Sequence, residues 1–139
     1  MKKIFLDTNI ILDLLGERDP FYSSAAQIAT LADKGQISMV ASALSFSTVH
    51  YLLSRIESDI VVRQKLSKFK IICEVSDLTD QVIDKGLISK FSDFEDALQY
   101  HCALQASCDL IITRNGKDFK LSDLPVMTAS EFLTSIKTY

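Results

Sequence analysis

Short apolar segments alternate with segments of helical periodicity along the whole chain, and this alternation limits the fold more than any other feature. Strand character is found at residues 3–6, 37–42, 71–75, 110–113 and, as a short edge strand, 125–128. Helical spacing is found at 10–15, from Ser23 or Ser24 to Gly35, and at 44–56, 59–69, 80–90, 94–107 and 131–137. Strands that alternate with helices are typical of a mostly parallel sheet with helices on both faces. We therefore predict one α/β domain over residues 1–139, a three-layer α/β/α sandwich.

The composition fits a folded domain and excludes several other classes of protein. Hydrophobic residues make up 47% and charged residues 24% of the chain, close to the average for soluble domains. No apolar run approaches the roughly 20 residues of a membrane-spanning helix, and Asp7 interrupts the N-terminal apolar segment before it reaches signal-peptide length. We expect a cytoplasmic protein without membrane contact. Because the net charge is −3, binding of nucleic acid requires a local basic patch or bound cations.

Polar residues follow the predicted strands, where open parallel sheets bind their ligands. Asp7, Thr8 and Asn9 follow the first strand, a serine-rich segment follows the second, and residues 113–119 follow the fourth. Each segment also has a purely structural interpretation. Asp7 can cap the helix that follows it, and Asn115 with Gly116 is a common hairpin-turn dipeptide.

The segment "SDFEDAL" places three acidic residues, Asp93, Glu95 and Asp96, at the start of an otherwise apolar helix. Two capping registers explain part of this charge, with either Ser92 or Asp93 as the N-cap residue. A metal site is the alternative. Carboxylates about 5 Å apart repel by roughly 3 kcal/mol at an effective dielectric of about 20, so a cluster of them needs a compensating cation. Oxygen ligands favour Mg²⁺ or Mn²⁺ over zinc.

Four motifs in this order resemble those of the PIN domains, which are best known as VapC-type toxins of bacterial toxin–antitoxin pairs. The motifs are "IFLDTNIILDLL", "DFEDALQYHCAL", "LIITRNGKDF" and "PVMTASEFL". The resemblance covers nearly the whole chain. It implies a compact α/β/α sandwich, an acidic pocket that binds Mg²⁺ or Mn²⁺ for RNA cleavage, an antitoxin partner and a homodimer.

By this resemblance, Asp7 matches the first acid of the family and Asp96 the third, and these two are the expected metal ligands. The fourth acidic position falls on Asn115, with Thr113 as the accompanying hydroxyl and Asp118 as a carboxylate that can substitute.

The second acid of the family, usually a Glu near the start of the helix after the second strand, has no counterpart here. This region offers the hydroxyls of Ser42, Ser45, Ser47 and Thr48, and no carboxylate appears until Glu57. Glu57 lies roughly 13 Å along a helix from Thr48, too far to replace the missing acid. Asp93, about one turn before Asp96, is the expected substitute.

We therefore predict a metal-dependent endoribonuclease, in which Asn9, Thr113 and Asn115 orient water and Arg114 or Lys117 holds the RNA backbone. A catalytically weakened PIN-like module that binds RNA or protein is the alternative, because the second acid is missing. A phosphatase of the haloacid-dehalogenase kind is disfavoured, since Asn9 stands where that chemistry requires a second Asp.

Overall fold

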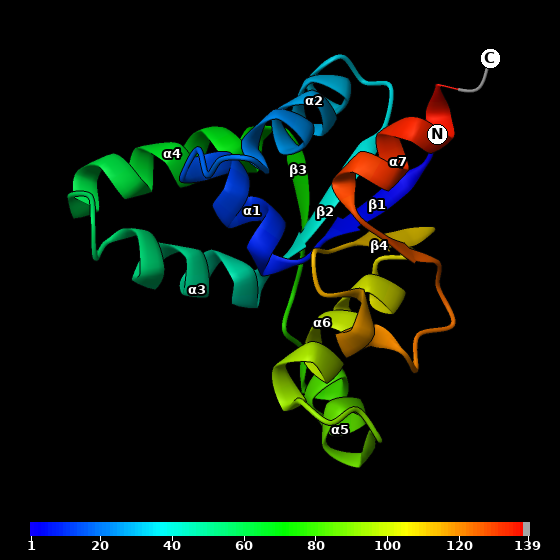
Figure 1. The fold of residues 1–139 in the computed structure, drawn as a ribbon. Helices are drawn as coiled ribbons and strands as arrows, with labels where there is room; N and C mark the ends of the chain where they lie inside the picture. The colour runs from blue at the N-terminus through cyan, green and yellow to red at the C-terminus, as the bar shows by residue number, and fades with distance from the viewer. Residues whose placement is uncertain (138–139) are drawn as a thin grey trace.

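The computed structural model describes residues 1–137, which form a parallel sheet between two layers of helices (Figure 1). The strands are β1 (Lys3–Leu6), β2 (Ser38–Ser42), β3 (Cys73–Ser76), β4 (Leu110–Ile112) and β5 (Val126–Met127). The helices are α1 (Thr8–Leu15), α2 (Tyr22–Asp33), α3 (Ala43–Leu53), α4 (Asp59–Ile71), α5 (Asp80–Ile88), α6 (Phe94–Gln105) and α7 (Ala129–Ile136), with a 3₁₀ turn η1 (Gly116–Phe119).

The sheet has the strand order β3-β2-β1-β4-β5, and every neighbouring pair is parallel. The chain first builds outward from β1 through β2 to β3, and then crosses to the other side of β1 to add β4 and β5. The order therefore reverses beside β1, where parallel sheets of this type open a crevice at the carboxyl ends of their strands. The predicted α/β/α sandwich with a parallel sheet is confirmed.

Two hydrophobic cores lie on the two faces of the sheet, because successive strand side chains point to opposite faces. Ile4 and Leu6 of β1 belong to the larger core, which α1, α2, α3, α4 and α7 cover. Phe5, between them, belongs to the smaller core, which α5, α6 and η1 cover. All three side chains are at most 1% exposed. The helix α6 that carries Asp96 is thus anchored on the face opposite α1.

Several elements differ locally from those predicted. Ile71 ends α4 instead of opening a strand, and α2 begins at Tyr22 without a serine cap. The hairpin interpretation of Asn115 and Gly116 is wrong, because β4 and β5 are parallel and the chain between them forms η1. Thr128 is not part of an edge strand. It caps α7 in a capping box with Glu131.

Among residues 1–137, no helix is both long and apolar enough to cross a membrane.

Candidate active site

Asp7 lies at the carboxyl end of β1, in the crevice where the strand order reverses. Its backbone N–H donates to the Ile112 carbonyl at 3.0 Å, which ties this position to the end of β4. Its side chain caps α1, with Oδ1 accepting from the Thr8 N–H at 2.9 Å. The capping interpretation is therefore correct, but it accounts for only one of the contacts of a carboxylate that is 7% exposed.

Three further side chains complete the surroundings of the Asp7 carboxylate, two of them from distant parts of the chain. The Thr113 hydroxyl donates to Oδ2 at 2.8 Å, Asn9 Nδ2 lies 3.4 Å from the same oxygen, and Gln99 Nε2 donates to Oδ1 at 3.2 Å. We call these donors, with the Thr8 N–H, the Asp7 cradle. The polar residues that follow the first and fourth strands thus meet at one site.

Asn9 and Thr113 are also fixed to each other and to the chain after β4. Asn9 Nδ2 donates to Thr113 Oγ1 at 3.2 Å, and Asn9 Oδ1 accepts from the Arg114 N–H at 3.3 Å. The Asn115 N–H donates to Thr113 Oγ1 at 3.1 Å. These contacts hold the segment after β4 against the start of α1.

Asp93 is the N-cap residue of α6, which decides between the two capping registers. Its Oδ1 accepts from the N–H groups of Glu95 at 2.8 Å and of Asp96 at 3.3 Å. Asp93 therefore has a structural role, whether or not it also substitutes for the missing acid. In this register Asp96 is the N3 residue of α6, but among the described residues its carboxylate makes no capping-box bond to the Asp93 N–H.

The carboxyl of Asp96 lies in an environment that disfavours its charge. Burial, followed by the charges of neighbouring carboxylates, raises its pKa from 3.8 to about 7. These neighbours are, in order of decreasing effect, Asp93, Asp7, Asp118 and Glu95. No basic side chain among the described residues contributes to this shift. Negative charge without a counter-charge is the condition under which a cation binds.

Asp7 and Asp96 line one cleft of about 230 Å³ between α1, α3 and α6. Its other walls are Thr8, Asn9, Leu12, Leu44, Thr48, Glu95 and Gln99. We call it the acidic cleft. The first and third acids of the predicted set therefore share a cavity, although they are 89 positions apart in the sequence. Within residues 1–137, no group of three Asp, Glu, His or Cys side chains is close enough together to hold a metal ion.

Gln99 is the residue of this site that the sequence interpretation missed. It lies one turn after Asp96 on α6, and its side chain is 3% exposed. Besides Asp7, Gln99 Nε2 contacts Ser45 Oγ at 2.9 Å and Thr8 Oγ1 at 3.3 Å, while Ser42 Oγ donates to Oε1. A polar residue three positions from an acid lies on the same helix face, and this spacing was the available signal.

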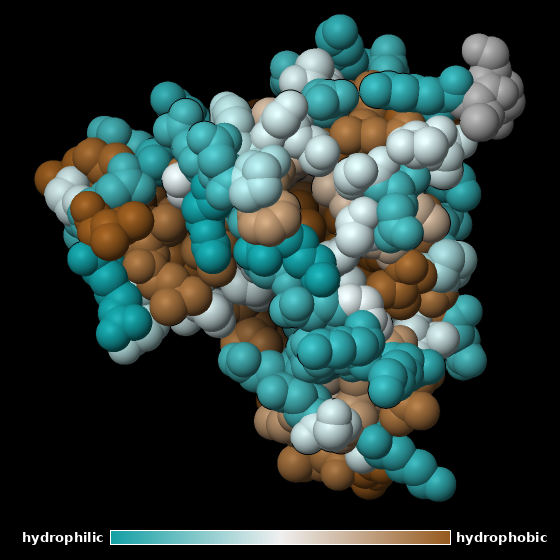
Figure 2. All heavy atoms as spheres, viewed as in Figure 1, coloured by the Kyte–Doolittle hydropathy of each residue, from teal (hydrophilic) through white to brown (hydrophobic). Residues whose placement is uncertain are grey.

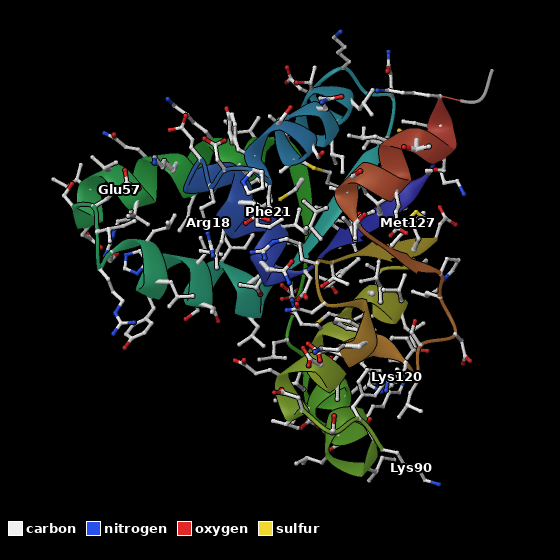
Figure 3. All side chains as sticks on the ribbon, viewed as in Figure 1. Arg18, Phe21, Glu57, Lys90, Lys120 and Met127 are labelled. Atoms are coloured by element: carbon white, nitrogen blue, oxygen red, sulfur yellow. The ribbon has the colours of Figure 1, made fainter. Side chains whose placement is uncertain are left out.

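Neutral groups occupy the region where the second acid was expected. Thr48 lines the acidic cleft from α3, and the buried Ser45 one turn earlier is 2.7 Å from Thr8 Oγ1. Glu57 is remote: it follows α3, lies far from α6 in Figure 3, and pairs with Lys65 at 2.9 Å. The prediction that Glu57 cannot replace the missing acid agrees with this placement.

The remaining predicted residues lie around the rim, on or beside η1. Asn115 precedes η1 without capping it, and Lys117 and Asp118 are exposed on it. Asp118 is close enough to act on the charge of Asp96. Their predicted roles stay predictions.

Arg114 pairs with Asp13 of α1, an ion pair that was not predicted. Its Nε and Nη2 donate to the two oxygens of Asp13 at 2.7 and 3.1 Å, and Asp13 is 0% exposed. The guanidinium also lies 4.1 Å from the centre of the Phe21 ring. Arg18 Nε approaches Asp13 at 3.8 Å, and Figure 3 shows Arg18 and Phe21 together beside α1. To contact RNA as predicted, the Arg114 guanidinium therefore has to leave its ion pair with Asp13.

Residues 3–117 match the family model of the PIN domain. Ribonuclease VapC1 from Aquifex aeolicus (strain VF5) is 28% identical over 139 residues, an alignment that covers 94% of this chain and 93% of the relative.

Solved structures share the fold at lower identity. The toxin–antitoxin complex from Klebsiella pneumoniae contains a chain with a TM-score of 0.64 and 22% identity, and the alignment covers 91% of this chain and 97% of that one. For VapBC2 from Rickettsia felis, bound to a DNA fragment from the promoter, the TM-score is 0.63 at 18% identity, with 90% and 96% of the two chains covered.

Proposed function

The chain belongs to the PIN domain family, and on that premise we propose that it is a metal-dependent endoribonuclease and the toxin of a toxin–antitoxin pair. The observation that carries this proposal is the shared cleft of Asp7 and Asp96, in which the negative charge around Asp96 has no basic partner. The relative from Aquifex aeolicus is named a ribonuclease, and it aligns with nearly the whole chain.

The donor set fits a hard divalent cation. The cleft offers carboxylate, hydroxyl and amide oxygens, and its two buried or half-buried acids suit Mg²⁺, which retains several waters and uses only one or two protein carboxylates. This explains how such an ion can bind although, within residues 1–137, no three acidic side chains are arranged so that they could hold it together. Asp7 and Asp96 are the proposed ligands, and Mn²⁺ is the usual substitute for Mg²⁺ at oxygen sites. When bound, the ion supplies an activated water and neutralises charge on the scissile phosphate.

The protein residues hold the ligands and the substrate. The Asp7 cradle fixes the direction of the Asp7 carboxylate, and Thr113 and Asn9 belong to it. Thr113, Asn9 and Asn115 also offer polar groups that orient water at the rim. Lys117, which is exposed on η1, is the proposed contact with the RNA backbone. Asp93 and Asp118 add negative charge near Asp96, which raises the attraction of the cleft for a cation.

The proposal is tested by incubating the purified protein with single-stranded RNA and Mg²⁺ or Mn²⁺, with and without chelator. We expect cleavage that the chelator stops and that both Asp7→Asn and Asp96→Asn reduce by at least about a hundredfold. Asp84→Asn, a carboxyl change at an exposed position of α5, is the matched control and retains activity. Cleavage that persists in the Asp96 variant refutes the assigned role.

The second candidate is a catalytically weakened PIN-like module that binds RNA or another protein. It is favoured by the neutral residues at the place of the second acid, above all Thr48 and Ser45. A protein that retards RNA in a gel but neither binds Mn²⁺ nor cleaves any RNA supports this candidate against the nuclease.

We further propose an antitoxin partner, a homodimer and a cytoplasmic location. Apolar side chains are exposed over α3, α4 and the turn between them, at the left of Figure 2, and include Tyr51 at 64%, Ile56 at 78% and Ile60 at 69%. Exposed apolar patches are typical of protein contacts. Light scattering of the purified chain measures its oligomeric state, and co-expression with the product of the neighbouring gene tests for a complex.

A further inference from the structure

The side chain of Gln99 is a fully partnered amide inside the wall of the acidic cleft. It is 3% exposed and is flanked on α6 by the apolar Leu98 and Tyr100. A buried amide without partners is costly, by roughly 1–3 kcal/mol in proteins. Here the amide contacts side chains from α1, from the end of β2 and from α3, and within residues 1–137 no buried side-chain polar atom lacks a partner. An apolar residue would fill the same space, so the amide is present for its hydrogen bonds.

The partners of Gln99 fix the orientation of its amide. An ionised carboxylate only accepts hydrogen bonds, so the nitrogen must face Asp7 Oδ1, at 3.2 Å. The oxygen on the other side accepts from the Ser42 hydroxyl, and Ser42 in turn caps α3 by accepting from the Ser45 N–H at 3.0 Å. Both the nitrogen and the oxygen of the amide are therefore held, and the amide links the start of α3 to the Asp7 carboxylate.

The same helix carries a second glutamine that serves as an internal comparison. Gln105 donates to Ser76 at 3.0 Å and to the Asp77 carbonyl at 2.8 Å, at the end of β3. It is not among the residues that line the acidic cleft. Two glutamines on one helix thus tie it to the sheet, but only Gln99 contacts an acid of the proposed site.

We propose that Gln99 is a positioning residue that aims the Asp7 carboxylate at the divalent ion and, with Ser42 and Ser45, takes the structural place of the missing second acid. This inference rests on the proposed function and deepens it. In the proposed site, two carboxylates bind the ion and a neutral hydrogen-bond network positions one of them. Such outer partners of a ligand commonly change metal affinity or activity by about 10–100-fold when they are removed.

Two substitutions of matched shape move the affinity in opposite directions. Gln99→Met keeps the volume and removes the donor to Asp7, and we expect it to weaken Mn²⁺ binding by about tenfold. Gln99→Glu places an added carboxylate beside Asp7, and we expect Mn²⁺ to bind more tightly than to the wild type. Loss of folding cannot produce this tighter binding. Gln105→Met is the control and leaves the affinity unchanged.

The experiment is calorimetric titration of each purified variant with Mn²⁺ in the absence of RNA, together with kcat and KM for RNA cleavage at saturating Mn²⁺. Because Gln99 is buried and does not reach the substrate, we expect Gln99→Met to lower kcat and leave KM unchanged. Equal Mn²⁺ affinities of the Gln99→Met and wild-type proteins overturn the proposal, as does a wild-type protein that binds no Mn²⁺. A wild type that binds Mn²⁺ and cleaves no RNA, with binding weakened in Gln99→Met, supports the positioning role and refutes the nuclease.

Discussion

The Asp96→Asn substitution is expected to stabilise the metal-free protein while it removes the proposed activity. In the folded protein, burial and four acidic neighbours raise the pKa of Asp96 from 3.8 to about 7. Above pH 7 a shift of this size corresponds to about 4 kcal/mol of unfavourable free energy for the ionised carboxyl. Solvent screening of the half-buried group and the favourable charge–dipole interaction at the start of α6 reduce this to about 1–2 kcal/mol.

The sign of the pH dependence follows from the raised pKa. The folded protein holds the Asp96 proton more tightly than the unfolded chain, so the stabilising contribution is complete below pH 3.8 and is lost as the pH rises to about 7. The asparagine that replaces it in the variant does not titrate. The stability advantage of Asp96→Asn over the wild type should therefore grow between pH 4 and pH 7 and stay constant above.

The assay is urea denaturation of both proteins at pH 4.5, 6 and 8 in the presence of EDTA, repeated at pH 8 with Mn²⁺. We expect Mn²⁺ to stabilise the wild type and to have a much smaller effect on the variant, because a ligand that binds only the folded state raises its stability. Asp84→Asn, at an exposed position of α5, serves as the control for a change of one charge. The predicted cost of the ionised Asp96 carboxyl is refuted if Asp96→Asn is no more stable than the wild type at pH 8 without metal, or if the difference does not depend on pH.

Three further predictions concern other parts of the structure. Arg114→Met leaves the buried charge of Asp13 without its main partner and should lower the free energy of unfolding by about 3 kcal/mol, whereas the double variant with Asp13→Leu should recover most of it, as measured by urea denaturation. Thr48→Glu adds a carboxylate to the acidic cleft and should tighten Mn²⁺ binding by about tenfold in calorimetry; unchanged binding would show that Thr48 does not face the ion. Thr128→Ala removes the cap of α7 and should lower the melting temperature, at a cost of about 1 kcal/mol.

The sequence was sufficient to predict the layers of the fold and the polar residues that lie at the strand ends. The period of the apolar residues predicts a buried parallel sheet, and the rule that ligands bind at the carboxyl ends of strands brings Asp7 and Thr113 together, as their 2.8 Å hydrogen bond shows. Capping patterns left two registers open at α6, because Ser92 and Asp93 are both good caps. Only the structure distinguishes them.

The hydrogen-bond partners of buried polar residues could not be predicted, because they depend on long-range packing. Gln99 is separated from Asp7 by 92 positions, and its spacing from Asp96 indicates a shared helix face but not that the amide contacts Asp7. The ion pair of Asp13 could not be predicted either. Its position on α1 resembles that of an ordinary surface acid, and its partner Arg114 is 101 positions away.

The order in which the ribosome makes this chain bears on when its cleft is complete. Asp7 is made before the Gln99 and Thr113 side chains that hold it, which follow 92 and 106 positions later. A nascent chain that ends before Thr113 contains Asp7 without the complete Asp7 cradle. Under the proposed function, ribosomal RNA therefore meets a complete acidic cleft only after most of the chain has been made.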